Sequence, residues 1–260
     1  MNKNCMVRQV SGTGIEIKCG DFRLAIDAFC RDESGIYPDT PGCICEDLFR
    51  EIRAGDLKIL IFTHEHSDHF NVPLVVSAWK LNQDLQILSN SAVAEQLIKA
   101  GVSRSNIKIL IHGSEKRIPE HVQQWDVWKY GTFQIRGFYS RHAGKEYRDV
   151  EHISLILQAE EKKIVFLGDA QPEQELFQRI KEENDTPDWM FLPFSLMGRN
   201  SVRKKMAEML QIRNIWILHC PVEEKDVFEW IKHTREICEN ASDDLPAPIF
   251  GQPEMMWHSL

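Results

Sequence analysis

Short apolar runs separated by turn residues dominate the chain and predict many strands. Near the N-terminus, Ile15 and Ile17 alternate with polar residues, and Gly/Ser and Gly-Asp turns separate the runs, as in an antiparallel meander. Later apolar runs of similar length, bounded by turn residues, favour further strands. The strands predicted in this way span residues 6–11, 14–19, 22–29, 58–63, 125–130, 133–140, 153–158, 164–167, 189–194 and 215–218.

Helices are predicted where apolar residues recur at helical spacing between start and stop signals. Pro73 lies in the first turn of one helix, Ser201 is a candidate N-cap for another, and Gly101 follows a third. Residues 30–45 lack periodicity and hold Gly, Pro, Asp and Ser, so we expect a long loop at a functional rim. One predicted helix begins at about residue 72, and the others span 47–54, 92–100, 173–183, 202–212 and 225–239.

The order of these elements favours a single α+β domain over residues 1–260. Strands occur in two blocks, helices flank both blocks, and no linker-like segment separates the halves. Such an order predicts two sheets packed face to face with helices outside. The composition, with 43% apolar and 27% charged residues, is typical of a globular chain.

Charge and cysteine content narrow the expected compartment and partners. The net charge of −8 argues against a protein that coats nucleic acid, because that binding depends on Lys and Arg. Neither a secretory leader nor an apolar run of about 18 residues is visible, so we expect a cytoplasmic protein without a membrane partner. The seven cysteines are odd in number and scattered, which favours reduced thiols over a disulfide framework. Composition does not indicate the oligomeric state.

The most informative string is Thr63-His-Glu-His-Ser-Asp-His69, directly after a predicted buried strand. In an extended stretch His64 and His66 point the same way, while Asp68 and His69 approach from where the chain turns. Buried polar groups need partners, so these side chains would be unfavourable in a core unless each had a hydrogen-bond partner or a metal ion to bind. The spacing is not that of a helical HExxH zinc protease, since Asp68 occupies the position of the second histidine.

Three later residues of the same kind also follow apolar strands. His142, Asp169 and His219 come just after the predicted strands 133–140, 164–167 and 215–218. Each alone would be an ordinary turn residue. Together with the first string they make five His and two Asp, which is the ligand count for two divalent ions that share a bridging carboxylate.

This pattern resembles the metallo-β-lactamase-fold hydrolase superfamily, and the resemblance extends over nearly the whole chain. It rests on HxHxDH after a strand, followed by a His, a Gly-Asp pair and a final His at later strand ends. The resemblance implies a four-layer αββα sandwich of two mixed β-sheets with outer helices and with metals at one edge. Position by position, it implies that the first ion is held by His64, His66 and His142, the second by Asp68, His69 and His219, with Asp169 bridging and Asp27 supporting the ligands.

Within the superfamily, the early Ile-Asp-Ala-Phe string and the Thr-His-Glu-His-Ser-Asp-His-Phe string most resemble the L-ascorbate-6-phosphate lactonase-like branch. Position 66 is His, whereas flavodiiron oxidoreductases carry Glu there. The long arm with which RNase Z grips tRNA is not visible. These features favour a small-molecule hydrolase.

A binuclear centre of this kind predicts an enzyme. Two ions can lower the pKa of a shared water to about 7, and the resulting hydroxide would hydrolyse a small, anionic ester, lactone or phosphoester. Asp68 and His69 are the candidate catalytic residues, with Asp68 orienting the nucleophile or passing a proton to the leaving group. Glu65 is expected to point away from the ligands. Zinc is the first choice of metal, with manganese and iron as alternatives.

Two other functional classes stay open at this stage. A nucleic-acid phosphodiesterase similar to RNase Z would show a basic exosite and salt-sensitive binding. A mononuclear iron oxygenase, or a noncatalytic metal-binding protein, would show iron or a single metal per chain.

Four residues are candidates for substrate binding. Tyr37 is the large aromatic residue within the predicted loop, and Arg141 precedes a candidate ligand. Arg199 and Arg203 flank Ser201. If Ser201 is an N-cap, the basic residues 203–205 lie in the first turn of the helix. A bound anion there would interact favourably with the helix dipole and the free amides.

Overall fold

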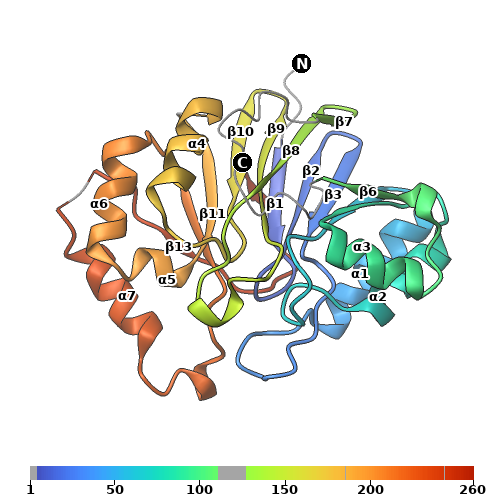
Figure 1. Ribbon diagram of the computed structural model, residues 1–260, viewed down its shortest axis with the longest axis horizontal. Coiled ribbons are helices and arrows are strands. Elements are labelled where there is room, and N and C mark those ends of the chain that lie inside the picture. The colour runs from blue at the N-terminus through green and yellow to red at the C-terminus, as the bar shows by residue number, and fades with distance from the viewer. Residues whose placement is uncertain (1–4, 111–126, 185, 243) are drawn as a thin grey trace.

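Two β-sheets packed face to face form the centre of the molecule, with helices on both outer sides (Figure 1). The computed structural model describes residues 5–110, 127–184, 186–242 and 244–260. In spatial order, the first sheet contains β14 (His258–Ser259), β1 (Cys5–Gln9), β2 (Ile15–Cys19), β3 (Phe22–Ile26), β4 (Leu57–Ile61), β5 (Gln86–Ser89) and β6 (Ile107–Ile109). The second contains β13 (Ile249–Phe250), β12 (Ile215–Leu218), β11 (Trp189–Pro193), β10 (Lys162–Phe166), β9 (Ile153–Ala159), β8 (Phe133–Tyr139) and β7 (Trp128–Tyr130).

The helices divide between the two outer faces, as Figure 1 shows. Those of the N-terminal half cover the first sheet and those of the C-terminal half cover the second. The first group is α1 (Gly42–Ala54), α2 (Val72–Leu81) and α3 (Ser91–Lys99). The second group is α4 (Gln174–Asn184), α5 (Phe194–Met197), α6 (Asn200–Met209) and α7 (Trp230–Glu239), and short 3₁₀ turns occur at η1 (Arg104–Asn106), η2 (Lys145–Tyr147) and η3 (Glu223–Lys225). The predicted αββα sandwich with two mixed sheets is confirmed.

Apolar side chains fill three layers between these elements. Ile17 and Ile61 of the first sheet meet Phe166 and Trp216 of the second in one buried cluster. A second cluster lies between the first sheet and its helices, and a third lies between the second sheet and its helices. Strands covered on both faces must be apolar on both, which explains the continuous apolar runs that predicted them.

Strand direction brings the chemically informative residues to one edge. Strands β3, β4, β5 and β6 are parallel, as are β10, β11, β12 and β13. Strand β9 is antiparallel to both β8 and β10, so β8 runs in the same direction as β10. The carboxyl ends of β3 and β4 therefore share an edge within the first sheet, and those of β8, β10 and β12 share an edge within the second.

Most predicted strand ends lie within three residues of the observed ones, but two helix starts were wrong. Helix α1 begins at Gly42 rather than at residue 47, directly after Pro41. Ile44, Leu48 and Ile52 recur every four residues on its buried side, so the helix extends into part of the predicted loop. The loop therefore covers only residues 30–41.

Helix α7 begins at Trp230, not at residue 225. The chain first makes the 3₁₀ turn η3, and the carboxylate of Asp226 then accepts hydrogen bonds from the backbone N–H groups of Trp230 and Ile231. Asp226 thus supplies the start signal that the apolar pattern did not reveal. Strands β5, β6, β13 and β14 were not predicted, and residues 125–126 of one predicted strand lie outside the described residues.

The expectation of reduced thiols was wrong for one pair of cysteines. Cys5 and Cys19 face each other across β1 and β2, with 4.3 Å between their Cα atoms, and form a disulfide. Antiparallel pairing placed them opposite each other, which spacing along the chain could not show. The five other cysteines are not joined in disulfides.

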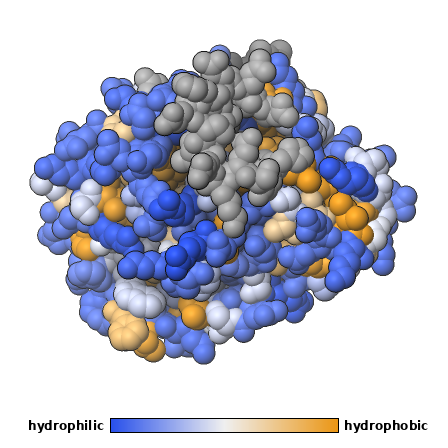
Figure 2. Space-filling view, in the orientation of Figure 1, coloured by the Kyte–Doolittle hydropathy of each residue, from blue (hydrophilic) through white to orange (hydrophobic). Residues whose placement is uncertain are grey.

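The surface in Figure 2 is largely hydrophilic, with separate apolar patches. Among the helices of the described residues, none has both the length and the apolar character needed to cross a membrane.

Candidate metal centre

The candidate ligands lie on loops that leave the shared edge of the sheets. His64 and His66 follow β4, His142 follows β8, Asp169 follows β10 and His219 follows β12. Of the seven candidates, four are buried, namely His64, His69, His142 and Asp169, and three are half-buried, namely His66, Asp68 and His219. The fold therefore brings together polar residues that are far apart in the chain and largely removes them from water.

Three strand ends turn through left-handed backbone conformations. Asp27, Gly168 and His219 have φ values of 48°, 55° and 60°. Residues other than glycine pay about 1–2 kcal/mol for such conformations, and functional sites often contain them. Position 168 has a second constraint, because a Cβ there would lie 2.6 Å from Nε2 of His152.

Three histidines form the first group of candidate ligands. Nε2 of His64 lies 3.1 Å from Nδ1 of His66 and 3.2 Å from Nε2 of His142. All three ligand atoms lie within 4.8 Å of one another. We refer to His64, His66 and His142 as the three-histidine cluster.

Two carboxylates and two histidines form the second group, the Asp/His cluster of Asp68, His69, Asp169 and His219. Oδ2 of Asp68 lies 2.8 Å from Nε2 of His219. Oδ2 of Asp169 lies 3.6 Å from Nε2 of His219 and also 3.5 Å from Nε2 of His142. Asp169 therefore stands between the two clusters, with one oxygen near a nitrogen of each.

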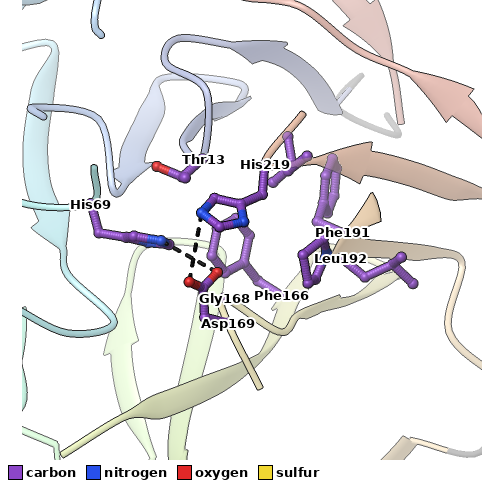
Figure 3. A pocket seen from close by; sticks show the side chains of 10 residues that line it. Thr13, His69, Phe166, Gly168, Asp169, Phe191, Leu192 and His219 are labelled. Atoms are coloured by element: carbon purple, nitrogen blue, oxygen red, sulfur yellow. Dashed lines mark ion pairs between the residues drawn. The ribbon is translucent and has the colours of Figure 1, made fainter. Parts of the chain in front are cut away.

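Figure 3 shows how the second cluster converges on a small cavity. The side chains of His69 and His219 point toward the carboxylate of Asp169 from opposite loops. Apolar residues, among them Phe166 and Leu192, close the other side of the cavity. Its volume of about 10 Å³ suits an object the size of one water molecule.

The unpartnered atoms of this cluster suit a cation. Nδ1 of His69 lies 2.8 Å from Oδ2 of Asp27, which also accepts a hydrogen bond from the Thr63 hydroxyl at 2.7 Å. With Asp27 as the partner of Nδ1, Nε2 of His69 faces Oδ1 of Asp169 at 3.4 Å. Among the described residues, neither of these two buried atoms has a hydrogen-bond partner. A carboxylate oxygen and an imidazole nitrogen directed at the same small space are the ligand types that zinc uses.

Burial and neighbouring charges shift the pKa values of the candidate ligands. Burial opposes the charge on Asp169, but the combined attraction of His219 and His69 holds its pKa well below the usual range. Burial likewise opposes a charge on His69, but Asp169 and Asp68 raise its pKa well above the ordinary value. Burial lowers the pKa of His64 well below that of a free histidine, which leaves a lone pair available.

Comparison with known proteins identifies the family. A family model described as a β-lactamase superfamily domain matches residues 45–234. The chain belongs to the β-lactamase superfamily. Membership confirms the predicted resemblance to the superfamily and the prediction of an enzyme, and the lactonase-like branch stays a prediction. A comparison with curated protein sequences finds no match.

Solved structures with the same fold are distant in sequence. The metallo-β-lactamase fold protein YhfI from Bacillus subtilis is 14% identical, with a TM-score of 0.62 and 99% coverage of both chains. Igni18, a metallo hydrolase from Ignicoccus hospitalis, is 15% identical, with a TM-score of 0.62 and coverage of 98% of this chain and 99% of that one. CmlA, a diiron β-hydroxylase from Streptomyces venezuelae, is 10% identical, with a TM-score of 0.59, and the match covers this whole chain and 54% of CmlA. At these identities the likeness shows the fold alone.

In this superfamily member, the loop of residues 30–41 lies beside the candidate metal centre. The ring of Tyr37 stacks on His219, and the backbone N–H of Arg31 donates to the carbonyl of Ser67 at 2.9 Å. Val222, which follows His219, donates its N–H to the carbonyl of Ile36 at 2.8 Å. The loop thus contacts both sides of the Asp/His cluster, as its predicted position at the rim requires.

Three residues beside the clusters were missed by sequence reasoning. The hydroxyl of Thr13 donates to the carbonyl of Asp68 at 2.5 Å, and the ring of Tyr147 lies 4.9 Å from that of His66. His152 lies behind the ligands, and burial lowers its pKa to about 3. Thr13 lies in the bend between β1 and β2 but is not a metal-ligand residue type, and Tyr147 lies in a 3₁₀ turn, so neither carried the signal that identified the ligands.

Of the three arginines predicted to contact substrate, two are exposed and one is buried. Arg199 is exposed and is itself the residue before α6, so Ser201 lies inside the helix and is not its N-cap. Arg203 is buried, and its guanidinium lies 3.1 Å from Sγ of Cys238, so it is not at the solvent-facing helix end that was predicted. Arg141 is exposed and pairs with Glu173 at 2.7 Å.

Two further predictions concern side chains beside the clusters. The carboxylate of Glu65 lies 3.3 Å from the amide nitrogen of Asn90, and Glu65 belongs to neither cluster. Asp27 accepts hydrogen bonds from both the N–H and the hydroxyl of Thr63 and lies 2.8 Å from Nδ1 of His69. Its support of the ligands stays a prediction.

Proposed function

We propose that this chain is a hydrolase that holds two divalent ions, one in the three-histidine cluster and one in the Asp/His cluster. The observation that carries the proposal is that Nε2 of His69 and Oδ1 of Asp169, which face each other at 3.4 Å in the second of two adjacent ligand groups, make no hydrogen bond within the described residues. Asp169 would contact both ions. Zinc is the first choice because imidazole and carboxylate are among its usual ligands, with manganese or iron as alternatives.

Two divalent ions bound there would supply a water with its pKa lowered to about 7 and would polarise the bond that is attacked. The protein's own groups would orient that reaction. Asp68 has a carboxylate oxygen 2.8 Å from Nε2 of His219, and its carbonyl accepts the hydrogen bond from Thr13. Because its main chain is held, Asp68 can accept a proton from the nucleophile and pass it to the leaving group. His69 would be kept in orientation by Asp27.

The charge of the site favours an anionic substrate. Two divalent ions contribute +4 and the carboxylates of Asp68 and Asp169 contribute −2, which leaves +2 before hydroxide or substrate binds. A small ester, lactone or phosphoester with a negative group fits this balance, and a phosphorylated sugar lactone is one member of that class. Tyr37 and Arg199 are the proposed substrate contacts. Arg141 is a third proposed contact, because only its Nη1 pairs with Glu173 and a guanidinium has further N–H donors, whereas Arg203 is buried.

We also propose that residues 1–260 act as one domain. The ligands come from both sheets, and one buried cluster joins the sheets. Separating the halves would divide the Asp/His cluster, because Asp68 and His69 follow β4 while Asp169 and His219 belong to the second half.

Elemental analysis of gently purified protein, with a substrate panel, tests the proposed function. We expect two zinc or manganese ions per chain, and hydrolysis of a lactone, phosphomonoester, phosphodiester or thioester that stops when a chelator removes the metal. Asp68→Asn should keep at least one ion and lose most of kcat. A stable metal-free protein whose melting temperature does not rise with added zinc or manganese would contradict the proposal. One iron per chain would favour the oxygenase alternative.

A further inference from the structure

His152 lies against the metal centre yet belongs to neither ligand cluster. Its ring centroid is 5.1 Å from that of His64 and 5.6 Å from that of His142, and the side chain is fully buried. Both ring nitrogens already have partners. The backbone N–H of Asp169 donates to Nε2 at 2.9 Å, and Nδ1 lies 2.8 Å from the hydroxyl of Ser140.

These bonds belong to a series that runs from the carbonyl of Leu167 through Ser154 and Ser140 to His152, and the bond at Leu167 fixes the donor in each of the others. The hydroxyl of Ser154 donates its single hydrogen to the carbonyl of Leu167 at 2.9 Å. It must therefore accept from the hydroxyl of Ser140, which lies 2.7 Å away. Ser140 then accepts from Nδ1–H of His152, and Nε2 is left with a lone pair for the N–H of Asp169. The buried chain of hydrogen bonds selects one tautomer of His152.

The main chain of Asp169 is thereby held on both sides. Its N–H is bound by His152, and its carbonyl accepts from the N–H of Ala143 at 2.8 Å. Ala143 follows His142, so this second bond ties Asp169 to a ligand of the other cluster. The preceding Gly168 has a φ of 55° and lies so close to Nε2 of His152 that a Cβ would not fit.

We propose that His152 is a positioning residue for Asp169 and thereby for the carboxylate between the two ions. Oδ2 of Asp169 must stay near both His142 and His219, and rotation of the peptide between Gly168 and Asp169 would move it away from both. An accepting nitrogen at His152 prevents that rotation. This inference rests on the proposed binding of two ions at the clusters.

Two substitutions of His152 distinguish the loss of the hydrogen-bond acceptor for Asp169 from the loss of the imidazole ring. In His152→Gln, the amide oxygen can reach the position of Nε2 and accept from Asp169. In His152→Asn, the shorter amide can replace Nδ1 as a donor to Ser140, but the N–H of Asp169 has no acceptor. Asn106→Ala is the control. It removes buried hydrogen bonds to Gln83 and Leu85 before β5, at the end of that strand opposite the ligand edge.

Zinc titration of metal-free protein against a chromophoric chelator is the decisive measurement, with the melting temperature of the same metal-free samples. We expect His152→Asn to weaken binding of at least one zinc ion about 10- to 100-fold, and His152→Gln to stay within about threefold of the wild type. Asn106→Ala should lower the melting temperature and leave zinc affinity unchanged.

Equal zinc affinity in His152→Asn and the wild type would overturn the inference, as would equal losses in the Asn and Gln variants. If His152→Asn does not fold, Ser140→Ala decides. It should weaken zinc binding at least threefold at a melting temperature no lower than that of Asn106→Ala, and unchanged affinity would overturn the inference. A wild type that binds no metal contradicts the proposed function, which is a separate result.

Discussion

The ring of Tyr37 stacks on the imidazole of His219, with 3.8 Å between the ring centroids and 17° between the ring planes. Tyr37 comes from the loop after β3 of the first sheet, whereas His219 follows β12 of the second. The backbone N–H of His219 also donates to the carbonyl of Gly12 at 2.7 Å. Two loops that leave strands of the first sheet therefore hold a candidate ligand that follows a strand of the second sheet.

Substitution of Tyr37 tests whether this stack shapes the substrate site. Tyr37→Phe keeps the ring and should leave kcat within about twofold, because stacking does not need the hydroxyl. Tyr37→Ala removes the ring that packs on one face of His219. Loss of an aromatic contact costs about 0.5–1.5 kcal/mol, so we expect KM to rise or metal affinity to fall by roughly 2- to 10-fold. Steady-state kinetics on any substrate found by the panel measures both. Unchanged kcat and KM in both variants would mean that the loop has no part in binding.

Single substitutions in the two clusters should change the metal content by one ion. His219 belongs to the Asp/His cluster alone, so His219→Ala should lower the content from two ions to one while the three-histidine cluster stays filled. His66→Ala should weaken the other position in the same way. Metal content of purified variants, measured by elemental analysis with protein quantified independently, checks this. Full occupancy in both variants would place the ions elsewhere.

Glu16 should make stability depend on pH. It lies buried on β2, with an oxygen 2.6 Å from Arg8, and burial is the main cause that raises its pKa to about 8. The folded state keeps a proton that the unfolded chain releases above about pH 4.5. The stabilisation is therefore complete below that pH and is lost as the pH rises through 8, at up to about 1.4 kcal/mol per pH unit.

Glu16→Gln removes this titration. The melting temperature of the variant minus that of the wild type should become more positive between pH 5 and pH 9, measured on metal-free protein so that metal binding does not contribute. Glu46→Gln removes the same formal charge from the exposed side of α1 and should give a constant difference. A constant difference for Glu16→Gln as well would show that its burial does not shift its titration in solution.

The cross-strand disulfide predicts the number of reactive thiols. With Cys5 and Cys19 joined, seven cysteines leave five free thiols in protein unfolded without reductant. After reduction, seven should react. Quantitative thiol labelling in denaturant checks both counts. Seven thiols before reduction would restore the expectation that all cysteines are reduced.

The candidate ligands could be found from the sequence because each follows a recognisable apolar strand. The string from His64 to His69 and the isolated His142, Asp169 and His219 share that signal. Buried strands are apolar on both faces, so polar residues at their ends stand out. Helix starts were less predictable. At α1, Gly, Cys and Pro residues obscured the apolar spacing that begins at Ile44, and at α7 the start is fixed by hydrogen bonds to Asp226 rather than by an apolar pattern.

The sequence by itself determined the sandwich class and which residue types could serve as ligands, because local apolar patterning sets the elements and strand ends mark their edges. Only the tertiary structure decided which other residues meet those ligands. His152 faces Asp169 through strand pairing, and Tyr37 reaches His219 across the two sheets. Arg203 is a charged residue of the kind expected at the surface, but it is buried against Cys238. These outcomes depend on contacts between distant segments, which one-dimensional spacing does not encode.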